Sequence, residues 1–391
     1  MSKRNIAIYL PSAAGLFRRS VGSAGGAERQ MTLLAAEMAS RNHTVGFVVY
    51  DVKDPIPDRE PGLTLVQRRA HASTGGLAGI VIEAFRVIRS LLVANGRLVV
   101  VRGGTPVVGF IALYCFLRRR QLVFSSANDF DFLPQERFSK FQSWLYSFGV
   151  RKADTVVVQS SDQVELAKKA YPTLRKLIHI PSFADDPPAI ATRRNPTAFI
   201  WAGRLVDYKR PLLFVELAAA LPGASFLLIP HVTKPPKEWE VDALAELAAA
   251  VAKVPNLELG GGLPHAELIV RLADAVAVVN TSEFEGMPNI FLEAWGQGVP
   301  ALTFSVDPGG VVAEKGLGIA AGGSWEAFVD GARMLWETRF DQEELAERTR
   351  AYLRATHSRK AVGTYWEELF QSLGAFDDRS QDGAVRRRRH P

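Results

Sequence analysis

The chain has 391 residues, 47% of them hydrophobic and 23% charged, which is the composition of an ordinary globular protein long enough for two domains. It has one cysteine, Cys115, which excludes an intramolecular disulfide and fits a reducing compartment. The 47 Lys and Arg residues outnumber the 41 Asp and Glu residues, and the net charge of +6 could favour anionic lipid, nucleic acid or phosphorylated substrates without selecting one.

The first half of the chain alternates between strand and helix patterns. Its N-terminus lacks the apolar run and small-residue cleavage site of a signal peptide, so we expect a cytoplasmic protein. Strands are expected at residues 5–10, 45–50, 97–101, 122–125 and 155–159, and helices at 27–41, 76–92 and 138–148. This alternation predicts a parallel sheet flanked by helices.

A Pro-rich, charged stretch over residues 183–196 predicts an interdomain linker. The pattern then restarts, with strands expected at 198–201, 226–229, 257–259, 275–279 and 301–304, and helices at 211–220, 243–251, 265–272, 291–296 and 325–336. We therefore expect an N-terminal α/β domain over residues 1–185 and a C-terminal one over 186–360. Residues 374–391 become polar, end in a run of arginines and predict a disordered basic tail.

Residues 105–117 form an apolar stretch that ends in Arg118, Arg119 and Arg120. The stretch is shorter than the roughly 20 residues that a membrane-spanning helix needs. Two interpretations stay open: a buried helix, or a monotopic contact with the arginines at the headgroups of an anionic membrane.

The most informative motif is Glu285-Gly286-Met287-Pro288-Asn289-Ile290-Phe291-Leu292-Glu293. It follows a predicted strand and turns into a helix near Pro288 or Asn289, so free backbone amides and the helix dipole favour an anion there. Glu285 lies on the turn and Glu293 about one turn inside the helix. Each carboxylate can accept two hydroxyl hydrogen bonds, which suits a sugar and a ribose.

Glu285 and Glu293, with Glu-Gly-Met-Pro, Leu-Glu-Ala and Gly-Val-Pro around them, resemble the E-x7-E motif of the retaining GT-B glycosyltransferases of family 4, the group 1 glycosyl transferases. The resemblance covers about residues 5 to 370. It implies two Rossmann-like domains facing across a cleft, with the acceptor mainly on the first and a nucleotide-sugar donor mainly on the second. It also implies that the helix over residues 361–373 crosses back to the first domain.

A second match is Trp201-Ala202-Gly203-Arg204-Leu205-Val206-Asp207-Tyr208-Lys209-Arg210. The family holds the donor diphosphate with an Arg and a Lys, and Arg204 and Lys209 occupy those places. Two fixed cations can stabilise the departing diphosphate without a metal. The resemblance therefore implies catalytic roles for Glu285, Arg204 and Lys209, no cofactor and no metal, with Arg210 as a weaker substitute for Lys209.

A third match places Gly25 and Gly26, in a Gly-Gly-Ala-Glu loop after the first strand, near the diphosphate. Glycine allows a close approach of the backbone. We further expect donor contacts from Gly286, Met287, Asn289, Ile290 and Glu293, because Pro288 has no amide to offer. We interpret His43, in an Asn-His-Thr-Val sequence before the second strand, as structural.

The chain departs from the family pattern after the strand at 122–125, where the family often has a histidine that contacts the transferred sugar. Here Asn128 is the nearest polar substitute and the candidate acceptor or sugar contact. Asp129-Phe130-Asp131 resembles the metal-binding Asp-x-Asp of the other large glycosyltransferase class, but in this position we expect a local turn or an acceptor contact.

The function expected from these residues is retaining transfer of a sugar from a nucleotide diphosphate to a glycan or lipid-linked acceptor, in the cytoplasm or at the inner membrane face. The alternatives are an epimerase or phosphorylase on the same fold, or an inactive homologue that binds a sugar nucleotide. Gly22 to Ala27 does not fit the G-x-G-x-x-G of dehydrogenases, and we expect no nucleic-acid partner. The sugar, nucleotide, acceptor and oligomeric state do not follow from the sequence.

Overall fold

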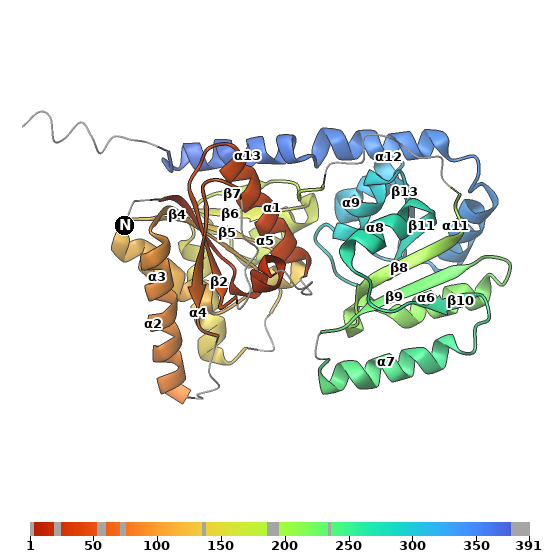
Figure 1. Cartoon of the computed structure of the whole chain (residues 1–391), viewed down its shortest axis with the longest axis horizontal. Coiled ribbons are helices and arrows are strands. Elements are labelled where there is room, and N and C mark those ends of the chain that lie inside the picture. Colours follow the sequence, from red (N-terminus) through yellow and green to blue (C-terminus); the bar gives the residue numbers. More distant parts are fainter. Residues whose placement is uncertain are drawn as a thin grey trace, which may run out of the picture.

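The computed structural model describes residues 4–18, 25–52, 60–70, 76–134, 138–185, 195–233 and 236–376. Two α/β domains lie side by side, and a helical C-terminal segment runs along both (Figure 1). The expected loop residues Gly22, Ser23 and Ala24 and the tail from residue 377 lie outside the described residues.

The N-terminal domain is built on a parallel sheet with the strand order β3-β2-β1-β4-β5-β6-β7. Its strands are β1 (Arg4–Tyr9), β2 (Val45–Tyr50), β3 (Leu63–Arg68), β4 (Gly96–Arg102), β5 (Gln121–Ser125), β6 (Thr155–Val158) and β7 (Leu177–His179). Central strands such as β2 and β4 are almost continuously apolar because helices cover both faces of the sheet.

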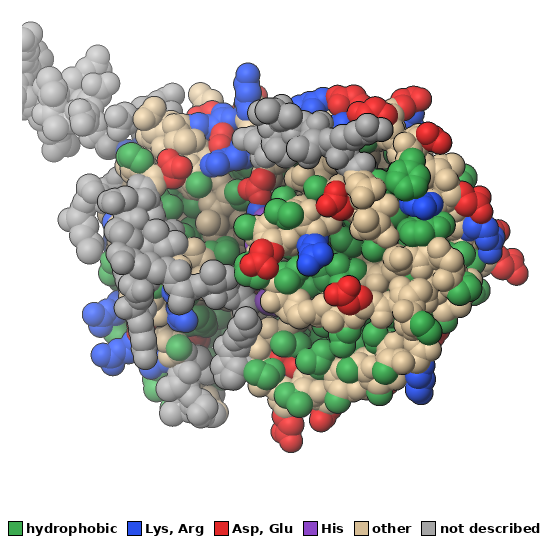
Figure 2. All heavy atoms as spheres, turned by 45° about the vertical axis from the view of Figure 1, so that its right-hand side comes forward, with side chains coloured by type: hydrophobic (Ala, Val, Ile, Leu, Met, Phe, Trp, Pro, Cys, Tyr) green, Lys and Arg blue, Asp and Glu red, His purple; other side chains and the backbone are tan. Residues whose placement is uncertain are grey.

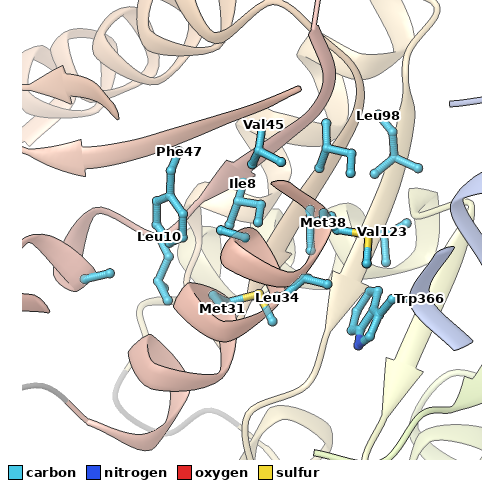
Figure 3. Close-up of a cluster of buried hydrophobic side chains, with 14 of the residues drawn as sticks. Ile8, Leu10, Met31, Leu34, Met38, Val45, Phe47, Leu98, Val123 and Trp366 are labelled. Atoms are coloured by element: carbon cyan, nitrogen blue, oxygen red, sulfur yellow. The ribbon is translucent and has the colours of Figure 1, made fainter. Parts of the chain in front are cut away.

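The helices of this domain are α1 (Gly26–Ser40), α2 (Gly76–Ala94), α3 (Val107–Arg118), α4 (Lys140–Lys152) and α5 (Ser161–Ala170), with short 3-10 turns η1 (Pro11–Phe17) and η2 (Asp129–Phe132). Helix α1 covers one face, where Ile8, Leu34 and Phe47 share a buried cluster (Figure 3). Helices α2, α3 and α4 supply buried side chains to the cluster on the other face. Gly109 and Gly149 bring α3 and α4 close together, since a Cβ on Gly149 would lie 2.6 Å from the Gly109 nitrogen.

The C-terminal domain repeats this plan with the parallel order β10-β9-β8-β11-β12-β13. Its strands are β8 (Ala198–Arg204), β9 (Phe226–His231), β10 (Leu257–Leu259), β11 (Ala275–Asn280), β12 (Ala301–Thr303) and β13 (Gly318–Ala320). Its helices are α6 (Pro211–Ala220), α7 (Glu238–Val251), α8 (His265–Ala273), α9 (Asn289–Gly296), α10 (Val311–Glu314), α11 (Trp325–Glu337) and α12 (Glu343–Thr356), with η3 (Asp207–Lys209) and η4 (Pro308–Gly310).

In both sheets the strand order reverses beside the first strand of the domain, between β1 and β4 and between β8 and β11. Ligands of open α/β sheets bind beyond the carboxyl ends of the strands at such switch points. The loops after β1, β4, β8 and β11 are therefore where a site is expected.

The last helix, α13 (Arg359–Ser372), belongs to the core of the N-terminal domain although it follows the C-terminal one. Trp366, Leu369 and Phe370 are buried in the same cluster as α1 (Figure 3). The preceding turn is held by two hydrogen bonds: Ala184 N donates to His357 O (2.8 Å), and His357 Nδ1 lies 2.7 Å from Ser182 O. The chain thus crosses between the domains twice, at residues 182–184 and at His357.

Helix α3 contains most of the apolar stretch at residues 105–117. Val108, Ile111, Ala112, Tyr114 and Cys115 are buried, so the buried-helix interpretation holds for this side. Its other side is exposed and carries Leu113, Phe116 and Leu117. Within the described residues, no helix is long and apolar enough to cross a bilayer.

Candidate active site

Lys209 and Glu285 meet at the carboxyl ends of β8 and β11. The Lys209 ammonium donates to Glu285 Oε1, and the two side chains are only 19% and 12% exposed. Ser282 Oγ donates to the same carboxylate oxygen at 2.9 Å. The two strands lie side by side in the sheet, so residues far apart in the sequence form one charged pair at the switch point.

The two arginines of this region have different surroundings. Arg204 is exposed at the end of β8, and its Nη2 donates to the Tyr208 hydroxyl at 3.0 Å. Arg210 instead donates to the carbonyl oxygens of Thr281 (2.7 Å) and Ser282 (3.2 Å), on the loop after β11. Arg210 is therefore engaged in holding this loop, which leaves Arg204 and Lys209 as the cations at the strand ends.

Thr281 joins the loop after β11 to the loop after β8, a contact that no sequence pattern indicated. Its hydroxyl accepts from Trp201 Nε1 (3.0 Å) and donates to the Lys209 carbonyl (2.6 Å). A further bond runs from Glu283 N to the Tyr208 carbonyl at 2.8 Å. The backbone that carries Lys209 is thus fastened to the backbone that carries Glu285.

Helices from the two domains begin at the same place. A Cβ on Gly26, the first residue of α1, would lie 1.9 Å from Asn289 Nδ2, at the first residue of α9. Gln30 Nε2 donates to Asn289 Oδ1 (2.8 Å) and so links the helices across the domain boundary. The first-turn amides of both helices lack intrahelical acceptors, so their positive ends converge on one region.

Met287 and Ile290 pack their side chains on the core of the C-terminal domain. They would therefore bind an anion through their backbone amides. Gly286 lies against the N-terminal domain, because a Cβ there would be 2.6 Å from Gln163 Nε2. Gln163 in turn donates to Asp129 Oδ1 at 3.1 Å. The loop of Glu285 therefore rests on α5 and η2.

Glu293, expected to contact a ribose, lies between the side chains of His265 and Arg29. Its Oε1 is 2.9 Å from His265 Nε2 and 3.9 Å from Arg29 Nε. Arg29 also pairs with Asp185, and burial lowers the pKa of this arginine. His265 and Arg29 were not identified as site residues from the sequence, although both stand in segments that resemble the family.

Asn128 precedes η2, and its Oδ1 is a buried atom that has no hydrogen-bond partner among the described residues. The two aspartates that follow have separate partners. Asp131 is buried and accepts from Ala127 N at 2.6 Å, whereas Asp129 accepts from Gln163. Burial raises the pKa of Asp129 to about 6, and the carboxylates of Asp162 and Glu285 act in the same direction.

Asp131 serves the local turn, one of the two roles expected for it. Across the described ranges, no group of three or more His, Cys, Asp or Glu side chains is placed to hold a metal ion.

Aromatic contacts also join the two domains near the Lys209–Glu285 pair. The ring of Phe130 lies 4.9 Å from that of Phe284 and 5.4 Å from that of Tyr208. Nearby, Gly309 N donates to Asp162 Oδ2 at 2.8 Å. Contacts therefore join the loops after β5, β8 and β11, and η4 contacts the start of α5.

The chain was compared with known proteins. Residues 25–181 match the family model of a glycosyl transferase 4-like domain. A search of curated protein sequences found no match.

Similar solved structures include sucrose-phosphate synthase from Thermosynechococcus elongatus, with a TM-score of 0.78 and 15% identity over 95% of this chain and 99% of that one. Anabaena HepE in complex with UDP-glucose has a TM-score of 0.69 and 16% identity over 94% of this chain and 99% of that one. WaaG, a glycosyltransferase involved in lipopolysaccharide biosynthesis, has a TM-score of 0.63 and 17% identity over 92% and 99%. The expected α/β fold of two Rossmann-like domains is confirmed by these likenesses.

Proposed function

We propose that the chain transfers a sugar from a nucleotide-diphosphate donor with retention of anomeric configuration. The premise is that it has the two-domain fold of the GT-B glycosyltransferases and that its residues 25–181 match a glycosyl transferase 4-like domain. The observation that carries the proposal is the partly buried Lys209–Glu285 pair beside the converging starts of α1 and α9. A cation, a carboxylate and two helix N-termini in one place suit a diphosphate joined to a sugar.

In this scheme the diphosphate lies against Lys209, Arg204 and the first-turn amides of α9. The Lys209 ammonium has three donors, so it can keep one bond to Glu285 and give others to phosphate oxygens. As the bond to the sugar breaks, charge develops on the diphosphate, and these fixed groups stabilise it. Gly25 and Gly26 allow the start of α1 to approach the same phosphates.

Glu285 orients and stabilises the sugar, and Glu293, held by His265 and Arg29, accepts from the ribose hydroxyls. The unpartnered Oδ1 of Asn128 accepts from a hydroxyl of the sugar or the acceptor. The acceptor approaches from the N-terminal domain, and the leaving phosphate takes its proton on the same face. This arrangement accounts for retention without a covalent intermediate.

We place the acceptor among glycans and lipid-linked precursors. Among the similar structures, WaaG acts in lipopolysaccharide biosynthesis, which is a function of that protein. The exposed apolar side of α3 and the arginines that follow it support a peripheral position on the inner face of an anionic membrane.

The test is a donor-hydrolysis screen over common uridine, guanosine and adenosine diphosphate sugars, followed by transfer assays with the donor found. NMR of the product would show whether the anomeric configuration is kept. Release of an epimerised free sugar with no acceptor would favour an epimerase, and a phosphate-dependent product would favour a phosphorylase. Donor binding without turnover would favour the inactive homologue.

We also propose that transfer needs no metal, because Arg204 and Lys209 occupy the place of the cation. Activity should persist in excess EDTA. Complete loss that is restored by manganese or magnesium would contradict this proposal and direct attention to Asp129 and Asp131.

A further inference from the structure

Helix α4 presents a row of stacked aromatic rings on the outside of the N-terminal domain. Phe141 and Trp144 lie 5.9 Å apart with an interplanar angle of 27°, and Trp144 and Phe148 lie 5.7 Å apart at 17°. Leu145, Tyr146 and Val150 form the buried side of the same helix. Trp144 is 60% exposed, although a large apolar ring on a monomeric protein is more often covered.

The row ends in a basic pocket of about 450 Å³. Trp144, Ser147 and Phe148 line one side, and Arg151, Lys152, Thr173 and Arg175 line the rest. The Arg151 guanidinium lies 5.9 Å from the ring centre of Tyr171, and Arg175 pairs with Asp154 at 2.7 Å. Three cations and two small hydroxyl side chains around one pocket suit a phosphate group.

The helices packed beside α4 in the same layer, α3 and then α2, also carry exposed apolar side chains. The exposed large apolar side chains there are Val81, Ile82, Phe85 and Leu92 on α2 and Leu113, Phe116 and Leu117 on α3. Phe116 is 80% exposed. So many large exposed apolar side chains on three neighbouring helices indicate an interaction site.

The charge of these three helices is strongly one-sided. They and the two residues after α3 contain Arg86, Arg89, Arg118, Arg119, Arg120, Lys140, Arg151 and Lys152. Their only acidic residue is Glu83, which pairs with the buried Arg68 at 2.8 Å. By contrast, the face that is turned to the viewer in Figure 2 carries both acidic and basic side chains.

We propose that the outer face of α2, α3 and α4 docks on an anionic lipid bilayer and that the α4 pocket holds the phosphate of one lipid headgroup. Phe141, Trp144 and Phe116 enter the interfacial region, where aromatic rings with basic neighbours bind membranes. A second copy of this chain fits less well, because two such faces would oppose positive charge to positive charge. The inference rests on the proposed peripheral position but not on the chemistry of transfer.

The test is sedimentation of the full chain with vesicles of phosphatidylglycerol and phosphatidylcholine in equal parts, and with phosphatidylcholine alone. We expect salt-sensitive binding to the first and little binding to the second. Trp144→Ser and the double variant Arg151→Glu, Lys152→Glu should each lower the partition coefficient about tenfold or more. Trp239→Ser removes an exposed tryptophan from α7 of the other domain and should leave binding unchanged.

A second double variant, Arg118→Glu with Arg119→Glu, reverses the same number of charges outside the pocket. If it weakens binding as much as the pocket variant does, the surface attracts lipid diffusely and the headgroup site is refuted. Equal binding to both vesicle types, or wild-type binding by the Trp144 variant, would overturn the docking face. Donor hydrolysis should stay unchanged in every variant, so a failure of the transferase proposal would be recognised separately.

Discussion

Lys209 and Glu285 form an ion pair whose groups are both largely shielded from water. The pair holds the lysine in place, and the ammonium has further donors that remain for an incoming diphosphate. Arg204 is exposed and bound to Tyr208, so it can reorient more easily. Lys209 is therefore held in position before the donor binds and Arg204 is not, so Lys209 should matter more for turnover.

Replacing Lys209 tests this difference. Lys209→Ala should lower kcat by about 100-fold or more, as the removal of a group that stabilises the transition state does elsewhere. Lys253→Ala, at an exposed lysine of the same domain, is the matched control and should retain activity. Circular dichroism would establish that the fold survives. Near-normal turnover in both Lys209→Ala and Arg204→Ala would refute the assignment.

The two carboxylates of the motif should separate in steady-state kinetics. Glu293→Ala should mainly raise the KM for the donor, because a ribose contact is present in both the ground state and the transition state. Glu285→Ala should mainly lower kcat, because its contact with the sugar strengthens as the bond breaks. If the two variants show the opposite pattern, their roles are exchanged.

Among the elements, α5 was not expected from the sequence, yet it supplies the N-terminal side of the domain contact. It begins at Ser161 after Ser160, whose hydroxyl accepts from Gln163 N at 3.3 Å. Gln163 and Asp162 then meet the loops at Gly286 and Gly309. The start of α5 is thus the surface on which the loop of Glu285 rests, while Ala167 further along the helix is buried in the core.

Gly286→Ala tests how much activity depends on the contact between the loop of Glu285 and α5. The new Cβ would lie 2.6 Å from Gln163 Nε2 and 3.5 Å from the Ala127 carbonyl, so the loop or the domains must shift. We expect kcat/KM to fall about tenfold, and Gln163→Ala in the same chain to restore part of the loss, because the two residues touch. Full activity of the single variant would show that the contact is dispensable.

Three of the four edge strands of the two sheets were not expected from the sequence, whereas the fourth, β10, was. The strands β3, β7 and β13 were not expected, and all three lie at sheet edges. β7 and β13 have only three residues each, and β3 alternates between buried and exposed positions. The central strands were recognised because burial on both faces makes them continuously apolar. Edge strands can be short or partly exposed, so their sequences need not be apolar throughout.

For the molecule as a whole, α12 and α13 connect the domains a second time. Trp366 and Phe370 are buried in the N-terminal core, so the two domains are joined by packing as well as by the chain. The turn between the helices contains His357, which is 1% exposed and bonded to Ser182. Burial lowers the pKa of His357 to about 4.

This histidine makes stability depend on pH. It stays neutral in the folded chain but takes up a proton near pH 6.5 when unfolded, so its contribution is present above that pH and is lost as the pH falls towards 4. Lowering the pKa from 6.5 to about 4 corresponds to about 3 kcal/mol of unfolding free energy. Urea unfolding at pH 7 and pH 4.5 should show a shallower pH dependence for His357→Gln. Identical slopes for the two proteins would contradict this explanation.

The sequence by itself determined the two α/β units and the position of the Glu285–Glu293 motif on a strand–turn–helix. These features are local, since strand and helix periodicity and turn residues act over a few positions. The expected starts of α6, α8 and β11, at Pro211, His265 and Ala275, agree with the structure for this reason.

Only the tertiary structure decided which of these residues meet. Lys209 contacts Glu285 across 76 positions, and Gln30 contacts Asn289 across 259. The aromatic row on α4 is exposed only because Leu145, Tyr146 and Val150 take the buried side of that helix. Such contacts depend on how whole sheets, helices and domains pack together, and no pattern within a single segment encodes that packing.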